Sequence, residues 1–236
     1  MNKKAKKYIN GAVDKLVAII QSNGTPRPEN ANVPDENLPW MFARLPPLEI
    51  ANCMLWKGII FDIFCVNFLH KEDRFIPQGC QNCHKVVVKP RTYKELLDLR
   101  KLQVELDYPS KCGIEERSFS KGLYGGYFYC GGIEDGRSRF KEIRSVIPKD
   151  VPVYLKRGCT EYEIEFGPSD QWKIAPYQDY IEKRITSKIS VEEREPIEKY
   201  FDDVSAIQKR WEAFAWKFDP TYSGPDLFPK QVVYSQ

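Results

Sequence analysis

Cysteine is the residue type in this chain that points most directly to chemistry. The chain has seven cysteines and only two histidines, so a metal site would depend mainly on sulfur. Two cysteines and one histidine form the run Cys80-Gln-Asn-Cys83-His84. Soft thiolate ligands select Zn²⁺ or an iron–sulfur cluster over Mg²⁺ or Ca²⁺, and four of them complete a tetrahedral site. The composition therefore favours zinc or iron–sulfur binding.

The pattern over residues 84–158 predicts the elements that would position these cysteines. Strands are expected at 86–88, 112–117, 123–129 and 151–157, and helices at 92–107 and 133–147. The first helix should begin at a capping box, Thr92-Tyr-Lys-Glu95. Pro90, Pro109, Gly131 and Pro148 are the stop signals between the elements. The order strand, helix, strand, strand, helix, strand is the split βαβ, or ferredoxin-like, pattern of an α+β domain.

This topology would bring five cysteines to one edge of the sheet. In a split βαβ sheet the spatial order is 4-1-3-2, so the first two strands start where the last two end. The second strand lies two strands from the first, roughly 10 Å away, which makes Cys112 a less favoured ligand. The preferred ligands are Cys80, Cys83, Cys130 and Cys159, with Cys112 and His84 as possible additional ligands.

Other roles for the cysteines stay open. Free cysteine is often buried, so all five could be core thiols, and a reactive thiolate could serve redox or nucleophilic chemistry. C-x-x-C-H is also the attachment motif of c-type haem, but that chemistry needs export and no signal peptide is predicted. Cys53 and Cys65 lie in an apolar segment and are expected in the core, whereas His70 is expected in solvent.

Helical segments are expected on both sides of the central unit. Residues 1–22 have apolar residues at helical spacing, and 176–218 have helical patterns as well. The proline-rich residues 22–47 are expected to be an irregular linker, and helix is favoured over strand for the apolar residues 48–69. We predict three parts: an N-terminal helical or wrapping extension (1–75), a ferredoxin-like domain with the cysteine cluster (76–170) and a C-terminal helical extension (171–236).

Residues 159–166 alternate polar and apolar side chains after the last predicted strand. The alternation predicts a further strand with Glu161, Glu163 and Glu165 on one face. Such a row either lies in solvent or contributes to a substrate pocket, where like charges would raise a carboxyl pKa. The exposed strand is the favoured interpretation.

Residues 121–129, with the sequence KGLYGGYFY, are similar to the RNP1 strand of RNA-recognition motifs. The resemblance covers nine residues and implies a nucleic-acid-binding face that includes Tyr127 and Tyr129. The first predicted strand lacks the aromatic residue that this family usually supplies from its partner strand. A sheet packed against the terminal helices explains the same aromatic residues, and we favour that interpretation.

Charge and hydropathy exclude several classes. With 36 Lys and Arg against 33 Asp and Glu, the net charge of +3 is too balanced for a polyanion bound over the whole surface. No uninterrupted run of roughly 20 apolar residues is present, so we predict a cytoplasmic protein without a membrane span. A Gly-x-Ser-x-Gly motif and a glycine-rich phosphate loop are also absent.

The functional hypothesis is therefore a cytoplasmic metal- or iron–sulfur-binding protein that acts as a binding or regulatory module. An iron–sulfur enzyme or electron carrier is the first alternative, and an RNA-recognition-motif-like nucleic-acid-binding protein is the second. A protein or a small molecule would be the partner of such a module. The sequence leaves open whether the chain is an enzyme.

Overall fold

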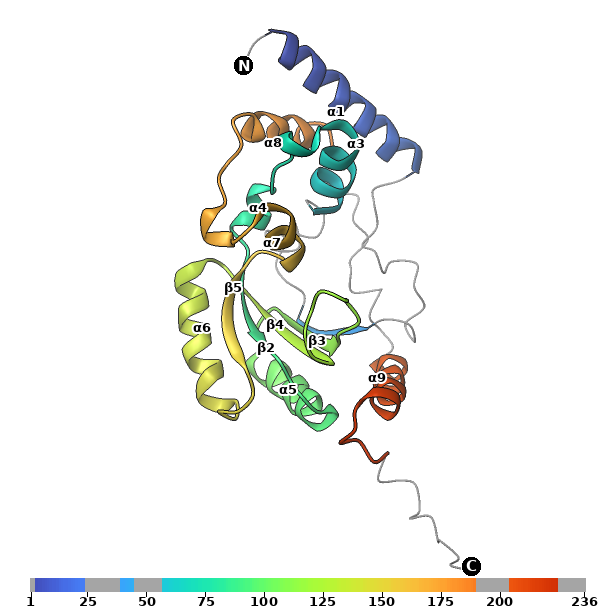
Figure 1. The fold of residues 1–236 in the computed structure, drawn as a ribbon, viewed down its shortest axis with the longest axis vertical. Helices are drawn as coiled ribbons and strands as arrows, with labels where there is room; N and C mark the ends of the chain where they lie inside the picture. Colours follow the sequence, from blue (N-terminus) through green and yellow to red (C-terminus); the bar gives the residue numbers. More distant parts are fainter. Residues whose placement is uncertain (1–2, 24–38, 45–56, 190–203, 225–236) are drawn as a thin grey trace, which may run out of the picture.

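An open five-stranded antiparallel sheet forms the centre of this α+β protein (Figure 1). The structure is a computed structural model, and it describes residues 3–23, 39–44, 57–189 and 204–224. The strands are β1 (Trp40–Arg44), β2 (His84–Val88), β3 (Ser110–Ile114), β4 (Tyr124–Cys130) and β5 (Val153–Arg157). Their order in the sheet is β1-β3-β4-β2-β5, and every neighbouring pair is antiparallel.

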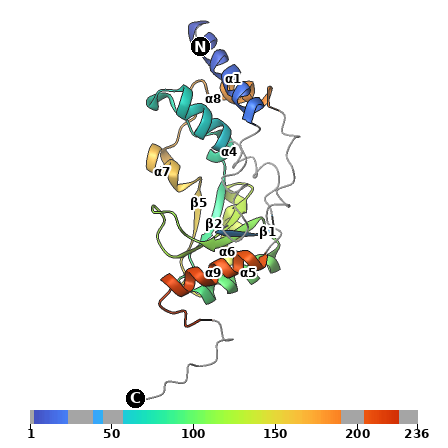
Figure 2. The same ribbon diagram turned by 90° about the vertical axis from the view of Figure 1, so that its right-hand side faces the viewer.

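Three helices cover one face of the sheet (Figure 2). They are α5 (Tyr93–Leu106), α6 (Ile133–Val146) and α9 (Val204–Phe218). Alternate strand residues point toward these helices, because successive side chains of a strand face opposite sides. The resulting sheet core includes Val86, Ile114 and Phe128 from the strands, with Leu96 of α5 and Trp211 of α9.

A second core lies beyond the end of the sheet where β2 begins (Figure 1). It is built by α1 (Lys3–Asn23), the π-helix η2 (Lys57–Cys65) with its short continuation α3 (Val66–Phe68), α7 (Thr160–Phe166) and α8 (Gln178–Thr186). The short elements η3 (Lys71–Asp73), α4 (Gln78–Gln81) and η4 (Ser169–Gln171) complete this region. Ile9, Val13 and Leu16 of α1 are buried at helical spacing, and we call this second cluster the helical core.

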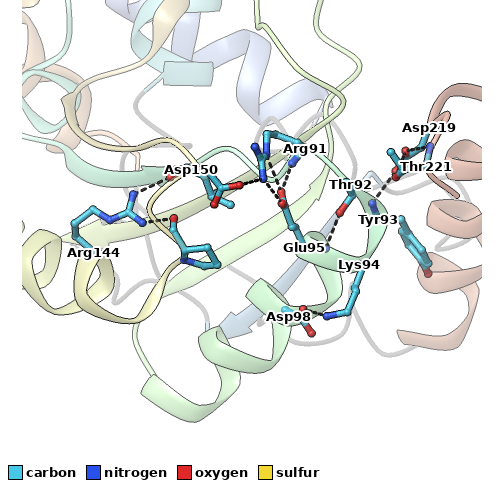
Figure 3. A network of polar contacts seen from close by, with 12 residues as sticks. Arg91, Thr92, Tyr93, Lys94, Glu95, Asp98, Arg144, Asp150, Asp219 and Thr221 are labelled. Carbon is cyan, nitrogen blue, oxygen red and sulfur yellow. Dashed lines mark hydrogen bonds and ion pairs between the residues drawn. The ribbon is translucent and has the colours of Figure 1, made fainter.

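The start of α5 confirms the predicted capping box (Figure 3). Thr92 Oγ1 accepts a hydrogen bond from the Glu95 backbone N–H at 3.1 Å. The Glu95 carboxylate reaches back to the Arg91 N–H at 2.7 Å, one residue before the helix cap. Asp219, directly after α9, accepts from the Tyr93 N–H at 2.7 Å. These contacts satisfy N–H groups that have no partner inside the helix.

The predicted strand at 159–166 is wrong, because these residues form α7. The Cys159 carbonyl oxygen accepts the backbone N–H groups of Tyr162 and Glu163 at 3.1 and 3.4 Å, which starts the helix. Tyr162 and Phe166, four residues apart, then share the face that packs in the helical core. An alternation this short is compatible with the two-residue period of a strand and with the 3.6-residue period of a helix. Burial of the Tyr162 and Phe166 rings favours the helix.

The predicted row of three glutamates on one strand face is therefore also wrong. Glu163 pairs with Lys156 of β5, whereas Glu165 pairs with Arg74 at 3.1 Å on another side of the helix. Glu163 and Glu165 are therefore held in separate ion pairs and do not form the row that the alternation suggested.

The expectation that residues 22–47 lack regular structure is wrong for β1. Trp40 and Met41 pair with Gly113 and Cys112 of β3, and the Ile114 N–H donates to the Pro39 carbonyl oxygen at 3.0 Å. An edge strand tolerates a proline directly before it, since that position needs no ladder N–H. Residues 24–38, and Cys53 within the apolar segment, lie outside the described residues.

The described parts of the remaining predicted elements lie close to their expected positions, and residues 190–203 of the predicted C-terminal helical region lie outside the described residues. The described part of the apolar segment, from residue 57, is helical, as favoured. None of the helices within the described ranges is long and apolar enough to cross a membrane. The division into three parts at residues 75 and 170 stays a prediction.

Candidate metal centre and its surroundings

Backbone pairing brings the segments that carry the four preferred cysteines to one end of the sheet. Cys80 lies in α4, and Cys83 directly precedes β2. His84, the first residue of β2, pairs with Cys130 of β4 on one side and with the last residue of β5 on the other. The Gly158 N–H donates to the Cys83 carbonyl oxygen at 2.8 Å, so Cys159 follows directly on this contact.

Arg157 and Gly158 fix the loop that carries Cys80 and Cys83. The Arg157 guanidinium donates to the carbonyl oxygens of Gln81 at 2.6 Å and Ser169 at 2.8 Å. Gly158 has a φ of +63°, and a Cβ there would lie 2.4 Å from the Trp172 ring. The chain therefore turns sharply between β5 and Cys159, which holds Cys159 beside the loop.

The side chains of these cysteines have separate partners. The Tyr162 hydroxyl donates to Cys80 Sγ at 3.5 Å, and Lys85 Nζ lies 3.4 Å from Cys159 Sγ. Cys130 faces the sheet core, where its thiol donates to the Phe128 carbonyl oxygen at 3.5 Å. Within the described ranges, no three His, Cys, Asp or Glu side chains are gathered closely enough to hold one metal ion.

Burial keeps the Cys130 thiol protonated in this arrangement. Desolvation raises its pKa to about 11, and the neighbouring Cys83 acts in the same direction. Cys80 and Cys83 are also buried, in the helical core, whereas Cys159 is partly exposed. The four cysteines thus lie at the junction of the two cores, with Cys130 contributing to one and the others contacting the second.

Cys112 does not lie at the predicted edge, which corrects its proposed place beside the other cysteines. It pairs with Gly126, four residues before Cys130 in β4, a displacement of roughly 13 Å along a strand. The reason is that β3 begins at Ser110, two residues earlier than predicted. Cys112 is fully buried in the sheet core, and burial raises its pKa to about 12.

The structure also places the two histidines and Cys65. His84 is partly buried, and its Nδ1 donates to the Asn82 carbonyl oxygen at 3.0 Å. Cys65 is a core thiol, as expected: its Sγ lies 3.8 Å from the Phe75 carbonyl oxygen, and burial raises its pKa to about 12. His70 is exposed.

Sequence reasoning missed a cationic cluster on the sheet face opposite the three helices. Lys85 and Lys111 point to this face together with Tyr127, because each alternates with a residue of the sheet core. Arg117 and the buried carboxylate of Glu115 lie beside them. The sequence shows lysines inside apolar strands, but only the register of β2, β3 and β4 shows that these lysines lie near one another.

No protein-family model matches the chain, and neither the curated proteins nor the solved structures contain a significant match. The functional interpretation therefore depends on the side chains of this chain alone.

Proposed function

We propose that this chain binds a zinc ion or an iron–sulfur cluster through Cys80, Cys83, Cys130 and Cys159, and acts as a binding or regulatory module. The observation that supports the proposal is the backbone register: His84 lies between Cys130 and the end of β5, with the C-x-x-C run directly before it. The required ligands come from three separate segments, so binding would tie the sheet end together.

The central unit of this proposal is a split βαβ, ferredoxin-like domain formed by β2, α5, β3, β4, α6 and β5. Its support is the chain order of these elements together with the adjacency of β2 to both β4 and β5. In this topology the starts and ends of non-consecutive strands share one edge, which is the property that the cysteine site needs.

Ligation in this site would need a rearrangement at an unchanged strand order, because the Cys130 thiol lies in the sheet core whereas Cys159 Sγ lies beside Lys85, which points to the opposite face of the sheet. Cys80 would leave the Tyr162 hydroxyl and Cys130 would leave the Phe128 carbonyl oxygen. Contacts of this kind are weak, whereas structural zinc contributes about 10 to 16 kcal/mol of apparent binding free energy in small zinc domains. The free energy of ligation would have to offset the loss of these contacts and the deprotonation of thiols that burial keeps protonated.

Of the two metal classes, the site chemistry supports both, since both accept four thiolates. The enzyme alternative has less support, because Glu163 and Glu165 are held in separate ion pairs. We therefore keep a binding or regulatory role as the proposal.

Metal analysis of anaerobically purified protein tests the proposal. A brown preparation that absorbs near about 400 nm would indicate an iron–sulfur cluster, and a colourless one with stoichiometric zinc would indicate a structural site. The variants Cys80→Ser and Cys130→Ser should lose the metal, whereas Cys65→Ser and Cys112→Ser serve as matched controls from the two cores and should keep it. Parent protein that takes up neither zinc nor iron would leave only buried thiols.

A further inference from the structure

The first helix, α1, lies at the outer end of the helical core, beside the short helix α3 (Figure 1). A groove of about 620 Å³ lies between the two helices, lined mainly by α1 and otherwise by Asn67 and Phe68 of α3. The Tyr8 hydroxyl donates to the Phe68 carbonyl oxygen at 2.6 Å, which holds α1 against α3. We call this depression the α1 groove.

Three lysines of α1 line the groove, namely Lys4, Lys7 and Lys15. All three are exposed, and none of the residues that line the groove is acidic. Among the residues that the structure describes, none forms an ion pair with these lysines. Asp14, the one acidic residue of α1, pairs with Lys188 at 2.8 Å. The α1 groove therefore carries positive charge that the described residues do not neutralise.

The place of Lys4 and Lys7 near the start of α1 adds to this excess of charge. The aligned peptide dipoles of a helix leave partial positive charge at its N-terminus, where acidic side chains are favoured. The first turn of α1 contains no acidic residue. Lys4 and Lys7 also lie three residues apart, a spacing at which like charges repel. A negatively charged ligand in the groove would reduce both unfavourable terms.

The spacing of the lysines limits the kind of ligand. Lys4, Gly11 and Lys15 follow each other at i, i+7 and i+11, so they share one stripe of α1, and the two lysines are about 16 Å apart along the helix axis. A Cβ at Gly11 would have nothing within 4 Å, and Ala12 and Phe68 provide apolar surface beside it. The groove thus has charge at both ends and open, apolar space between them, whereas a ligand with one anionic group would reach only one end.

We propose that the α1 groove binds an acidic amphipathic helix of a partner protein. Carboxylates three turns apart on such a helix would match the spacing of Lys4 and Lys15, because both helices have the same rise per residue. Apolar side chains between these carboxylates would occupy the space at Gly11. A nucleic-acid strand would match the charge, but it offers no aliphatic side chains for the surface at Ala12 and Phe68. The proposal does not depend on the metal site, since no cysteine lines the groove.

A synthetic acidic amphipathic peptide is the first probe, about four helical turns long, with glutamates along one stripe and leucines beside them. Titration of the labelled peptide with the full chain, followed by fluorescence anisotropy, should give saturable binding with one peptide per chain. A peptide with glutamine in place of every glutamate is the control, and it should bind at least about tenfold more weakly, as expected for the loss of several exposed ion pairs. Equal binding of the two peptides would overturn the proposal.

Gly11→Leu tests the groove itself. The new side chain would enter the open space at Gly11, and α1 should stay folded because leucine favours a helix more than glycine does. The affinity for the acidic peptide should fall at least about tenfold, with unchanged helix content by circular dichroism. Retained affinity in this variant would mean that the peptide binds outside the groove, which would contradict the proposal.

Lysine variants separate the groove from a general attraction to positive charge. Lys4→Gln and Lys15→Gln should each weaken peptide binding about threefold, as expected for one exposed ion pair. Lys6→Gln is the matched control: it removes the same charge from the start of α1, but Lys6 Nζ lies 5.6 Å from the centroid of the Tyr180 ring of α8 and does not line the groove. An equal loss in Lys6→Gln and Lys4→Gln would overturn the proposal.

A short single-stranded oligonucleotide is the competitor that tests the class of partner. The acidic peptide should stay bound when the oligonucleotide is added at the same concentration. Displacement of the peptide under these conditions would assign the lysines of α1 to polyanions in general and would overturn the assignment to an acidic helix.

Discussion

The structure gives Glu115 a role that its position in the sequence does not indicate. In the sequence it is one of two adjacent glutamates, whereas its side chain is fully buried and Glu116 is 44% exposed. Burial by itself would raise the Glu115 pKa, but hydrogen bonds and charges from Arg117, together with Ser120 and Lys89, lower it to about 2. The ionised carboxylate therefore contributes to stability while it organises the cations around it.

We expect Glu115→Gln to destabilise the protein by about 2 kcal/mol at neutral pH, because it leaves Arg117 without a bidentate carboxylate. The folded pKa lies below the ordinary value of 4.5, so the contribution is complete above about pH 4.5 and is lost as the pH falls toward 2. Urea unfolding of parent and variant at several pH values should show a difference that shrinks over this interval.

Glu116→Gln is the matched control for this series. Glu116 pairs with Arg210 at 2.7 Å on the surface, and exposed ion pairs contribute about 0 to 1 kcal/mol. A Glu115→Gln effect that is equally small, or that does not change with pH, would contradict the assigned role.

At the scale of elements, local signals identified most helices and strands of the central unit. Thr92 and Glu95 marked the start of α5, and the β-branched residues 86–88 marked β2, because caps and propensities act over a few neighbouring residues. Long-range packing decided the two elements that were predicted wrongly. α7 depends on burial of Tyr162 and Phe166, and β1 depends on a place beside β3.

Gly113 has no side chain, which allows the backbone at the start of β1 to approach β3 closely. A Cβ at this position would lie 1.9 Å from the Pro39 carbonyl oxygen and 2.9 Å from the Trp40 Cα atom, and both are backbone atoms that cannot move independently of the strand. This requirement links two residues more than 70 positions apart in the chain. A proline-rich segment gives no local indication of such a partner.

Gly113→Ala should therefore separate β1 from β3 and cost about 3 kcal/mol, the upper range for overpacking. The Ile114 amide, which donates to Pro39, should lose its protection against hydrogen exchange. Gly11→Ala is the control: nothing lies within 4 Å of a Cβ there, and alanine in a helix should stabilise α1 by up to about 1 kcal/mol. Retained Ile114 protection in Gly113→Ala would show that β1 is not held as described.

For the whole molecule, the positions of the four preferred cysteines show how far strand order can carry a prediction. The meeting of the segments that carry Cys80, Cys83, Cys130 and Cys159 followed from the order of elements, because register fixes which strand ends are neighbours. The directions of the side chains did not follow. Cys130 points into the sheet core and Cys80 into the helical core, and that outcome depends on residues as distant as Tyr162.

The two cores also predict how the molecule unfolds. The helical core is assembled from distant segments, with α1 packed against η2 and α8, and it meets the sheet mainly at the end that carries the cysteines (Figure 1). Regions with separate apolar cores open with separate free energies. The helical core can therefore unfold locally while the sheet stays folded.

Leu16→Ala tests this organisation, because Leu16 is fully buried in the helical core. We expect a loss of about 3 kcal/mol and faster amide exchange in α1 and α8, with unchanged protection in β2 and β4. Leu96→Ala, at an equally buried position of the sheet core, should give the opposite pattern, and Ile19→Ala, 38% exposed on α1, should change little. Uniform acceleration across the whole chain in both leucine variants would instead mean that the two cores form one cooperative unit, since a cavity in either would then lower the same global free energy of unfolding.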